Sequence, residues 1–344
     1  MSNSVTISQI AETAGVSTAT VDRVINGRSG VNPLTVRKVK EALVALGGAP
    51  PMRGRPRSTP NYRFAFVLPA ARLGFFDLVD RVIAQNAGEF RHQHVTEVTL
   101  RLPSHDFNAF AEELAKLTDY GGLAVLAPDV PAVKLAINEL VAAGVHVISM
   151  FSDVAGSMRK AFLGTDNRAA GRTAALLMGR SVLHRPEERC MLFSSATRYA
   201  AEIDRRIGFA QVMEERFPSI QVTRCIELPE SEEEAYDYAM QALPKRSAKD
   251  RISAAYCVGP GSFGVARALM DRGYKEHACY AVHDLLEIHR SMLVSGAVDY
   301  VLNQDVYVSV SAAVRALRGL QDGVRGALSF KNPRVEIVTQ ENLA

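Results

Sequence analysis

The sequence predicts an α/β protein in which a small all-α unit precedes two doubly wound parallel α/β lobes. Apolar residues recur at helical spacing up to about residue 48, and from residue 62 onward short apolar segments alternate with amphipathic ones. A repeated strand–helix order implies parallel sheets that carry helices on both faces. About ten such strands suit two lobes better than a single sheet.

Three short helices are expected at the N-terminal end of the chain. Thr6 and Gln9 have the spacing of a capping box, so the first helix should begin after Thr6. Gly15 should end this helix, because glycine tolerates the left-handed conformation of a tight stop. Ser17 can cap a second helix, and a third should begin near Pro33, which suits a first helical turn.

We expect a helical domain over residues 1–48, a linker over residues 49–61 and a two-lobed domain over residues 62–344. The linker holds four prolines, three arginines and one apolar side chain of any size, a composition that does not pack. The expected strands of the last domain are 64–68, 95–100, 123–126, 145–150, 161–164, 190–193, 222–226, 254–258, 279–282 and 298–302. The expected helices include 107–117, 133–143, 169–183, 205–217 and 306–320.

Charge is distributed unevenly along the chain, although the total is only +3. Residues 1–63 contain nine Lys or Arg and three acidic residues, a net charge of +6, which leaves −3 on the rest. A small basic end on a slightly acidic body suggests a polyanionic partner for that end.

Composition argues against a membrane protein, a secreted protein and a metalloprotein. No apolar run reaches the ~20 residues of a membrane span, and the polar N-terminus lacks the charged-then-apolar order of a signal sequence. The cysteines are far apart and form no CxxC pair, which is typical of reduced thiols in a cytosolic protein. They are Cys190, Cys225, Cys257 and Cys279. We therefore expect a cytoplasmic protein without a bound metal or cofactor.

Residues 6–25 form the most specific pattern in the sequence. Ala11 is small enough to let two helices cross closely, and Gly15 makes the turn between them. Val21 and Val24 hold the second helix against the first. The outer face of the second helix is then free to enter a DNA major groove. Docking to another protein is the alternative, and the basic charge favours DNA.

Residues 10–26, IAETAGVSTATVDRVIN, resemble the headpiece of the LacI/GalR family of transcriptional regulators, whose pattern is much like IAxxAGVSxxTVxRVxN. The resemblance implies a helix-turn-helix domain that binds a double-stranded DNA operator, usually as a repressor and a homodimer, and that is not an enzyme. By position it implies base contacts from Thr18, Ala19 and Arg23. It implies further DNA contacts, mostly to phosphates, from Thr6, Ser8, Ser17, Thr20, Asn26, Asn32 and Thr35.

Two features depart from the family pattern. Asp22 stands where a small residue is common, and it can either brace Arg23 or accept a hydrogen bond from a cytosine amine. The prolines of the linker argue against the hinge helix of the family. Residues 53–57, RGRPR, resemble an AT-hook instead, which would place Arg53 and Arg55 in an A·T minor groove. A flexible basic tether that touches phosphates is the alternative.

Within the same family, residues 62–320 resemble a sugar-binding protein of the ribose-binding type. Such a protein has a periplasmic-binding-protein type I-like fold, with its ligand between two lobes. The resemblance implies a small effector, a sugar or polyol, that controls operator affinity. It implies chain crossings near Asp166, near His289 and in the C-terminal third. The implied effector contacts, each after an apolar strand, are Phe75, Phe76, Ser152, Asp153, Asp166, Arg205, Asp284 and Gln304.

One departure concerns the effector. Family members often carry Asn-Pro before the two phenylalanines, whereas this chain has Leu73 and Gly74. One expected hydroxyl partner is therefore missing, which leaves a phosphorylated or non-sugar ligand open.

Residues 259–264, GPGSFG, are a literal GxGxxG motif between an expected strand and an expected helix. Asp284 follows at about the spacing of a ribose-binding acid, about twenty residues on. The alternative function is therefore an NAD(P)-binding oxidoreductase with a DNA-binding end. The late position of the motif counts against it, as does Pro260, which removes a backbone donor. A ligand-independent architectural DNA binder is a third alternative.

Overall fold

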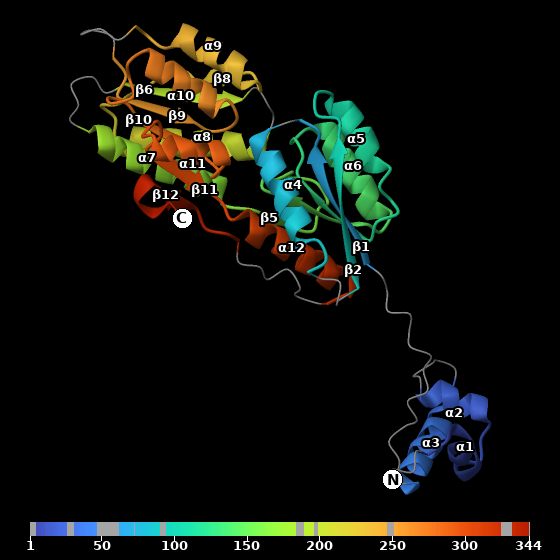
Figure 1. Cartoon of the computed structure of the whole chain (residues 1–344). Helices are drawn as coiled ribbons and strands as arrows, with labels where there is room; N and C mark the ends of the chain where they lie inside the picture. Colours follow the sequence, from blue (N-terminus) through green and yellow to red (C-terminus); the bar gives the residue numbers. More distant parts are fainter. Residues whose placement is uncertain are drawn as a thin grey trace. The chain divides into compact units, whose positions relative to one another are not determined.

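The computed structural model of the chain describes residues 5–25, 31–46, 62–71, 73–89, 94–183, 189–195, 199–245, 251–324 and 332–343. The chain divides into two compact units, Met1–Pro60 and Asn61–Ala344, each with its own apolar core (Figure 1).

The described part of the first unit holds the helices α1 (Ile7–Ala14), α2 (Thr18–Ile25) and α3 (Pro33–Ala45). The expected capping box is confirmed, because the Thr6 hydroxyl accepts from the Gln9 N–H and the Gln9 side chain accepts from the Thr6 N–H. Gly15 ends α1 in the left-handed conformation, with φ of 62°. Asn32 caps α3, because its side chain accepts from the Leu34 N–H at 2.9 Å.

A small apolar core holds the three helices together. Ile10 of α1, Val21 of α2 and Val39 of α3 are buried in it. Because Val21 fixes the inward face of α2, the opposite face of that helix stays available for contacts outside the unit.

The second unit contains two sheets, and the strands of the first sheet are β1 (Tyr62–Pro69), β2 (Val95–Leu102), β3 (Gly122–Val125), β4 (His146–Met150) and β5 (Phe162–Leu163). Their order is β2-β1-β3-β4-β5, and every pairing is parallel. Alternate residues of β1 face opposite sides: Phe64 and Phe66 pack toward α4 (Gly74–Asn86) and α12 (Val306–Gln321). Ala65 and Val67 pack toward α5 (Phe107–Ala115) and α6 (Pro131–Ala142). Figure 1 shows α5 and α6 on the opposite side of this sheet from α4.

The strands of the second sheet are β6 (Arg189–Ser195), β7 (Gln221–Val222), β8 (Ile226–Leu228), β9 (Ala254–Cys257), β10 (Cys279–His283), β11 (Tyr300–Asn303) and β12 (Glu336–Val338). The order is β12-β11-β10-β9-β6-β7, and β8 also pairs with β6. One face is covered by α7 (Asn167–Val182) and α8 (Ala200–Arg216). The other is covered by α9 (Glu232–Ala242), α10 (Ser262–Asp271) and α11 (Glu287–Val294). The predicted class, an all-α unit followed by two parallel α/β lobes, is confirmed.

The chain passes from the first lobe to the second after β5, near Asp166 as expected. The second crossing does not lie near His289. His289 belongs to α11, whose Met292 and Leu293 pack in the second lobe. A crossing follows β11, because α12 packs its apolar face against the first sheet. This crossing lies in the C-terminal third of the chain, as expected.

Two strands differ from the sequence prediction. The strand expected at 222–226 is two strands, β7 and β8, which pair with β6 near Cys190 and near Phe193 respectively. The antiparallel edge strand β12 was not predicted, because it has three residues and only Val338 of them is buried. Among the helices that are described, none is long and apolar enough to cross a membrane.

Candidate functional site

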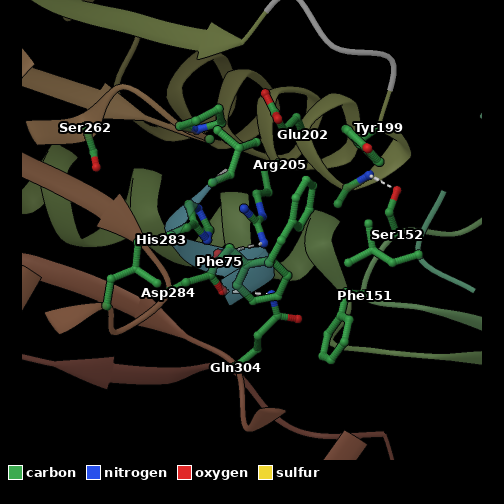
Figure 2. Close-up of a pocket in the computed structure, with 18 of the residues that line it drawn as sticks. Phe75, Phe151, Ser152, Tyr199, Glu202, Arg205, Ser262, His283, Asp284 and Gln304 are labelled. Atoms are coloured by element: carbon green, nitrogen blue, oxygen red, sulfur yellow. Dashed lines mark hydrogen bonds and ion pairs between the residues drawn. The ribbon is translucent and has the colours of Figure 1, made fainter. Parts of the chain in front are cut away.

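A cavity of about 160 Å³ lies between the two lobes, at the carboxyl ends of the strands of both sheets (Figure 2). This is the place where doubly wound folds bind ligands, because the loops that follow the strands converge there. The first lobe contributes the start of α4 and the residues after β3 and β4, and the second contributes the loops after β9, β10 and β11 and the start of α8.

Aromatic side chains form the first-lobe wall of the cavity. The rings of Phe75 and Phe151 meet edge to face, with centroids 5.2 Å apart and planes at 90°. The ring of Phe76 also meets that of Tyr199, which precedes α8 of the second lobe, with centroids 6.0 Å apart and planes at 63°. Phe75 is only half-buried, so part of its ring is open to a ligand.

A chain of buried polar groups crosses the cavity from one lobe to the other. Asn167 donates from Nδ2 to the Phe151 carbonyl at 3.1 Å and accepts from Arg205 Nε at 2.8 Å. Arg205 also donates to the Val258 carbonyl at 2.9 Å, and its Nη2 lies 3.9 Å from Asp284 Oδ2. Asp284 Oδ1 accepts from Gln304 Nε2 at 2.8 Å. These contacts hold the Arg205 fork and the Asp284 carboxylate in fixed positions.

A second link joins the lobes beside the cavity. The Ser152 hydroxyl, which follows β4, accepts from the Ala201 N–H at the start of α8 at 3.3 Å (Figure 2). This hydrogen bond joins a loop of the first lobe to a helix of the second.

Two histidines line the cavity in their neutral form. Burial lowers the pKa of His283 well below its ordinary value, helped by the nearby Arg205 guanidinium. Burial also lowers the pKa of His289. Nδ1 of His289 lies against the Asp284 carbonyl, which can only accept, so this nitrogen carries the hydrogen. Nε2 therefore accepts from the Ser262 hydroxyl at 2.7 Å.

Two residues that directly follow strands lie in the left-handed conformation. Phe151, after β4, has φ of 60°, and Asp284, after β10, has φ of 64°. Such a backbone costs about 1–3 kcal/mol for a residue other than glycine and is concentrated at functional sites. Both of these residues line the cavity.

Most of the predicted effector contacts come together in this cavity. Its lining includes Phe75, Phe76, Ser152, Arg205, Asp284 and Gln304. Asp153 does not line it. Its carboxylate accepts hydrogen bonds from the Arg159 guanidinium and the Ser149 hydroxyl. Burial acts to raise the pKa of Asp153, but these two donors lower it below its ordinary value. Asp166 does not line it either: it is exposed and caps α7 by accepting from the Ala169 N–H at 2.9 Å.

Sequence reasoning missed other lining residues. The polar and aromatic ones among them are Phe151, Tyr199, Glu202, Glu230, Glu232, Ser262 and His289. One signal for Glu202 was present, because it precedes Arg205 by three residues and so shares its helix face. The lining residues in loops, such as Phe151 and Glu230, gave no such signal, since only the tertiary fold brings them to the cavity.

The GxGxxG motif forms the turn between β9 and α10, but its phosphate position is filled. Glu232 Oε2 accepts from the Gly264 N–H at 2.8 Å, at the helix end where a dinucleotide would place its pyrophosphate. A Cβ on Gly259 would lie 2.6 Å from the Glu202 carboxyl, and one on Gly264 would lie 2.3 Å from the Glu232 carbonyl. The two glycines therefore leave room for Glu202 and Glu232 of the same chain. The carboxylates of these glutamates would repel a bound phosphate.

On the first unit, the predicted base-reading residues share the outer face of α2. Thr18, Ala19 and Arg23 are exposed, and Asp22 is half-buried. Of the other predicted contacts, Thr6, Ser8, Ser17 and Asn32 are exposed, and Thr20 and Thr35 are half-buried. Thr6, Ser17 and Asn32 also cap helices with their side chains. Asn26, Arg53 and Arg55 lie outside the described residues.

Comparison with protein families agrees with this division of the chain. Residues 6–50 match the family described as bacterial regulatory proteins, lacI family, and residues 64–324 match the periplasmic binding protein domain. The chain belongs to the LacI family of bacterial regulatory proteins. The resemblance seen in the headpiece sequence is thereby confirmed. Because this is a family of DNA-binding regulators and not of enzymes, the oxidoreductase alternative is not supported.

Solved structures show the same fold for the body of this LacI-family protein. A solute-binding protein of an ABC transporter from Burkholderia graminis, in complex with D-arabinose, has a TM-score of 0.74 at 19% identity, covering 83% of this chain and 98% of that one. The glucose-galactose binding protein GanP from Geobacillus stearothermophilus has 0.72 at 18%, covering 83% and 99%. A protein described as a LacI transcriptional regulator from Bacteroides fragilis has 0.70 at 18%, covering 82% and 98%. Identities this low show the fold alone. The search of curated proteins gave no match.

Proposed function

We propose that this LacI-family regulator is a repressor that binds its operator as a homodimer, and that a small sugar-like effector in the cavity between its lobes controls operator affinity. The observation that carries the proposal is the cavity itself: one chain combines a helix-turn-helix with an interlobe site built from an aromatic wall and a fixed Arg205–Asp284–Gln304 network.

The chemistry of the lining supports a ring-shaped, hydroxylated effector. The face of a sugar ring is apolar and suits the open part of Phe75, whereas its rim of hydroxyls suits fixed amide, carboxylate and guanidinium groups. We propose Phe75, Phe76, Ser152, Arg205, Asp284 and Gln304 as effector contacts, and we leave Asp153 and Asp166 out because other groups use their carboxylates.

A two-state coupling would follow from binding between lobes. An effector that contacts both lobes favours their closed arrangement, and it can shift operator affinity only as far as its affinities for the two arrangements differ. A dimer is proposed because one headpiece reads only a few base pairs, so two half-sites are needed for specificity. We also propose a cytoplasmic location, which an operator-binding role would require.

Arg23→Ala is expected to weaken binding to the selected operator by about 1–3 kcal/mol and to relax the base preference at one position of each half-site, as for a lost bidentate base contact. Fluorescence anisotropy with operator duplexes substituted at single positions measures both effects. Arg37→Ala is the matched control, since it removes the same charge from an exposed side chain of α3. If Arg23→Ala and Arg37→Ala lost affinity equally at every sequence, the assignment of α2 to the major groove would be wrong.

A thermal-shift screen of the full chain tests the effector site. The panel comprises pentoses, hexoses, polyols, sugar phosphates and NAD(P). A ligand at a hundred times its dissociation constant stabilises the folded state by about 2.7 kcal/mol, which raises Tm by roughly 5 °C for a domain of this size. We expect stabilisation by a sugar or polyol. A response to the nicotinamide cofactors alone would refute the proposed effector class.

A further inference from the structure

The turn between β10 and α11 carries part of the second-lobe side of the cavity. Asp284 opens this turn and Leu286 closes it, and both of them line the cavity. Asp284 is held in the left-handed conformation, with φ of 64°. Aspartate adopts this conformation more readily than most residues but still at a cost, so neighbouring contacts must hold it there. The direction of the Asp284 carboxylate therefore depends on what binds the backbone of the turn.

Two hydrogen bonds meet on the Asp284 carbonyl. One comes from the Leu286 N–H at 2.9 Å, within the turn, and the other comes from Nδ1 of His289 in α11. The Asp284 N–H donates to the Leu302 carbonyl of β11 at 3.0 Å. Of these three bonds, the one from His289 is supplied by a side chain, so a substitution can remove it.

His289 also binds the start of α10. A carbonyl can only accept, so Nδ1 carries the ring hydrogen and Nε2 accepts from the Ser262 hydroxyl at 2.7 Å. His289 is 2% exposed, and burial lowers its pKa, which keeps the ring neutral. The Ser262 carbonyl in turn accepts from the Tyr280 hydroxyl at 2.8 Å. One neutral ring thus ties the segments that follow β9 and β10 to each other.

The turn that His289 holds reaches the first lobe. Leu286 packs on Gly74 at the start of α4, where a Cβ would lie 3.0 Å from Leu286 Cδ1. The departure at Gly74 from the Asn-Pro pattern leaves room for this side chain. The same turn aims the Asp284 carboxylate at Gln304 and Arg205 (Figure 2).

We propose that His289 is a positioning residue of the effector site, whose Nδ1–H holds the turn from Asp284 to Leu286 in the conformation that binds the effector. This rests on the proposed function of the cavity as the effector site. A turn that is fixed before binding spares the effector the cost of ordering it. His289 then acts on affinity through the backbone of Asp284, and it does so separately from its packing.

Two substitutions separate the two ring nitrogens. His289→Asn keeps a donor near the place of Nδ1 and removes the acceptor for Ser262, whereas His289→Gln keeps an acceptor near the place of Nε2 and removes the donor to Asp284. Isothermal titration calorimetry of the full chain measures affinity for D-ribose, D-arabinose, D-glucose, D-galactose and D-glucitol. For the probe that binds most tightly, we expect affinity to stay within about three-fold in His289→Asn and to fall about ten-fold or more in His289→Gln.

Thermal unfolding of the same preparations shows whether affinity merely follows stability. Both variants lose one buried hydrogen bond, so a role in packing alone predicts similar losses of affinity in the two. His105→Asn is the matched control, because His105 is exposed in the first lobe and outside the lining. This control should leave the affinity unchanged and the free energy of unfolding within about 0.5 kcal/mol.

The position of the ring hydrogen can be observed directly. In the full chain labelled with ¹⁵N-histidine, the NMR signal that disappears in His289→Asn should have the chemical shifts of a neutral ring with its hydrogen on Nδ1. A structural role through packing would leave either ring nitrogen free to carry the hydrogen.

Three results would overturn the inference: a hydrogen on Nε2 of His289, an affinity that falls as far in His289→Asn as in His289→Gln, or no binding of any of the five probes to the unaltered chain. The last result would also refute the proposed sugar effector. A probe that alters operator affinity but binds both variants equally would refute the positioning role and leave the proposed function standing. The expected pattern of affinities with an unchanged operator affinity would do the reverse.

Discussion

Replacing Arg205 with alanine is expected to abolish effector binding and to lower the free energy of unfolding by about 3–5 kcal/mol, the range found when one partner of a buried ion pair is removed. Arg205 is 6% exposed and has partners on three sides: the Asn167 side chain, the Val258 carbonyl and the Asp284 carboxylate. Alanine leaves these groups buried and without the donor that satisfies them. Urea unfolding followed by circular dichroism measures the loss.

Two further variants separate charge from geometry at this position. Arg205→Lys keeps the charge but loses the planar fork, so it should recover part of the stability and little of the effector binding. Arg206→Ala removes a neighbouring, half-exposed guanidinium outside the lining and should change the unfolding free energy by less than about 1 kcal/mol. A small loss for Arg205→Ala, equal to that of Arg206→Ala, would show that the polar network does not hold the site together.

Gly171→Ala is expected to destabilise the protein by about 3 kcal/mol, at the upper end for an overpacked core, and to lower Tm by roughly 5 °C or more. The helices α7 and α8 touch where each carries a glycine. A Cβ on Gly171 would lie 1.9 Å from the Arg205 carbonyl, and one on Gly208 would lie 2.1 Å from the Arg168 carbonyl. These neighbours are backbone atoms that no rotamer change can move, so the helices must separate.

Separation of the two helices would also disturb the cavity, because Gly171 packs against the backbone of Arg205, which lines it. Effector affinity should therefore fall together with stability in Gly171→Ala, which thermal unfolding and calorimetry of the same preparation can compare. Arg180→Ala, on an exposed position of the same helix, serves as the control and should stay within about 0.5 kcal/mol of the unaltered protein. A change below 1 kcal/mol in Gly171→Ala would mean that the two helices tolerate a wider spacing.

Local patterns were sufficient to predict most of the fold. The capping box of Thr6 and Gln9 and the turn at Gly15 depend on neighbours in the sequence, and both are present in the structure. The strands of the two sheets are apolar because both of their faces are buried, which makes them visible in the sequence. The crossing after β11 was predicted only to within the C-terminal third of the chain, since its exact place depends on which sheet α12 covers.

The site could be predicted in outline for a similar reason. Polar residues that directly follow buried strands converge at one edge of a sheet, and Asp284 and Gln304 do so. The same position also suits a helix cap, and the sequence cannot distinguish the two roles. Asp166 caps α7 while the adjacent Asn167 is buried beside Arg205. Glu232, which fills the GxGxxG turn, comes from a separate helix and could be assigned only once the fold was known.

The most direct test of the account is the affinity of the full chain for its operator, measured with and without an effector that saturates the cavity. The operator is first selected from random duplexes, and anisotropy titrations then give the dissociation constant. The account predicts two related half-sites, a change in affinity of about five-fold or more on effector binding, and loss of that change in Gln304→Ala. An operator affinity that stays the same when the cavity is saturated would contradict it.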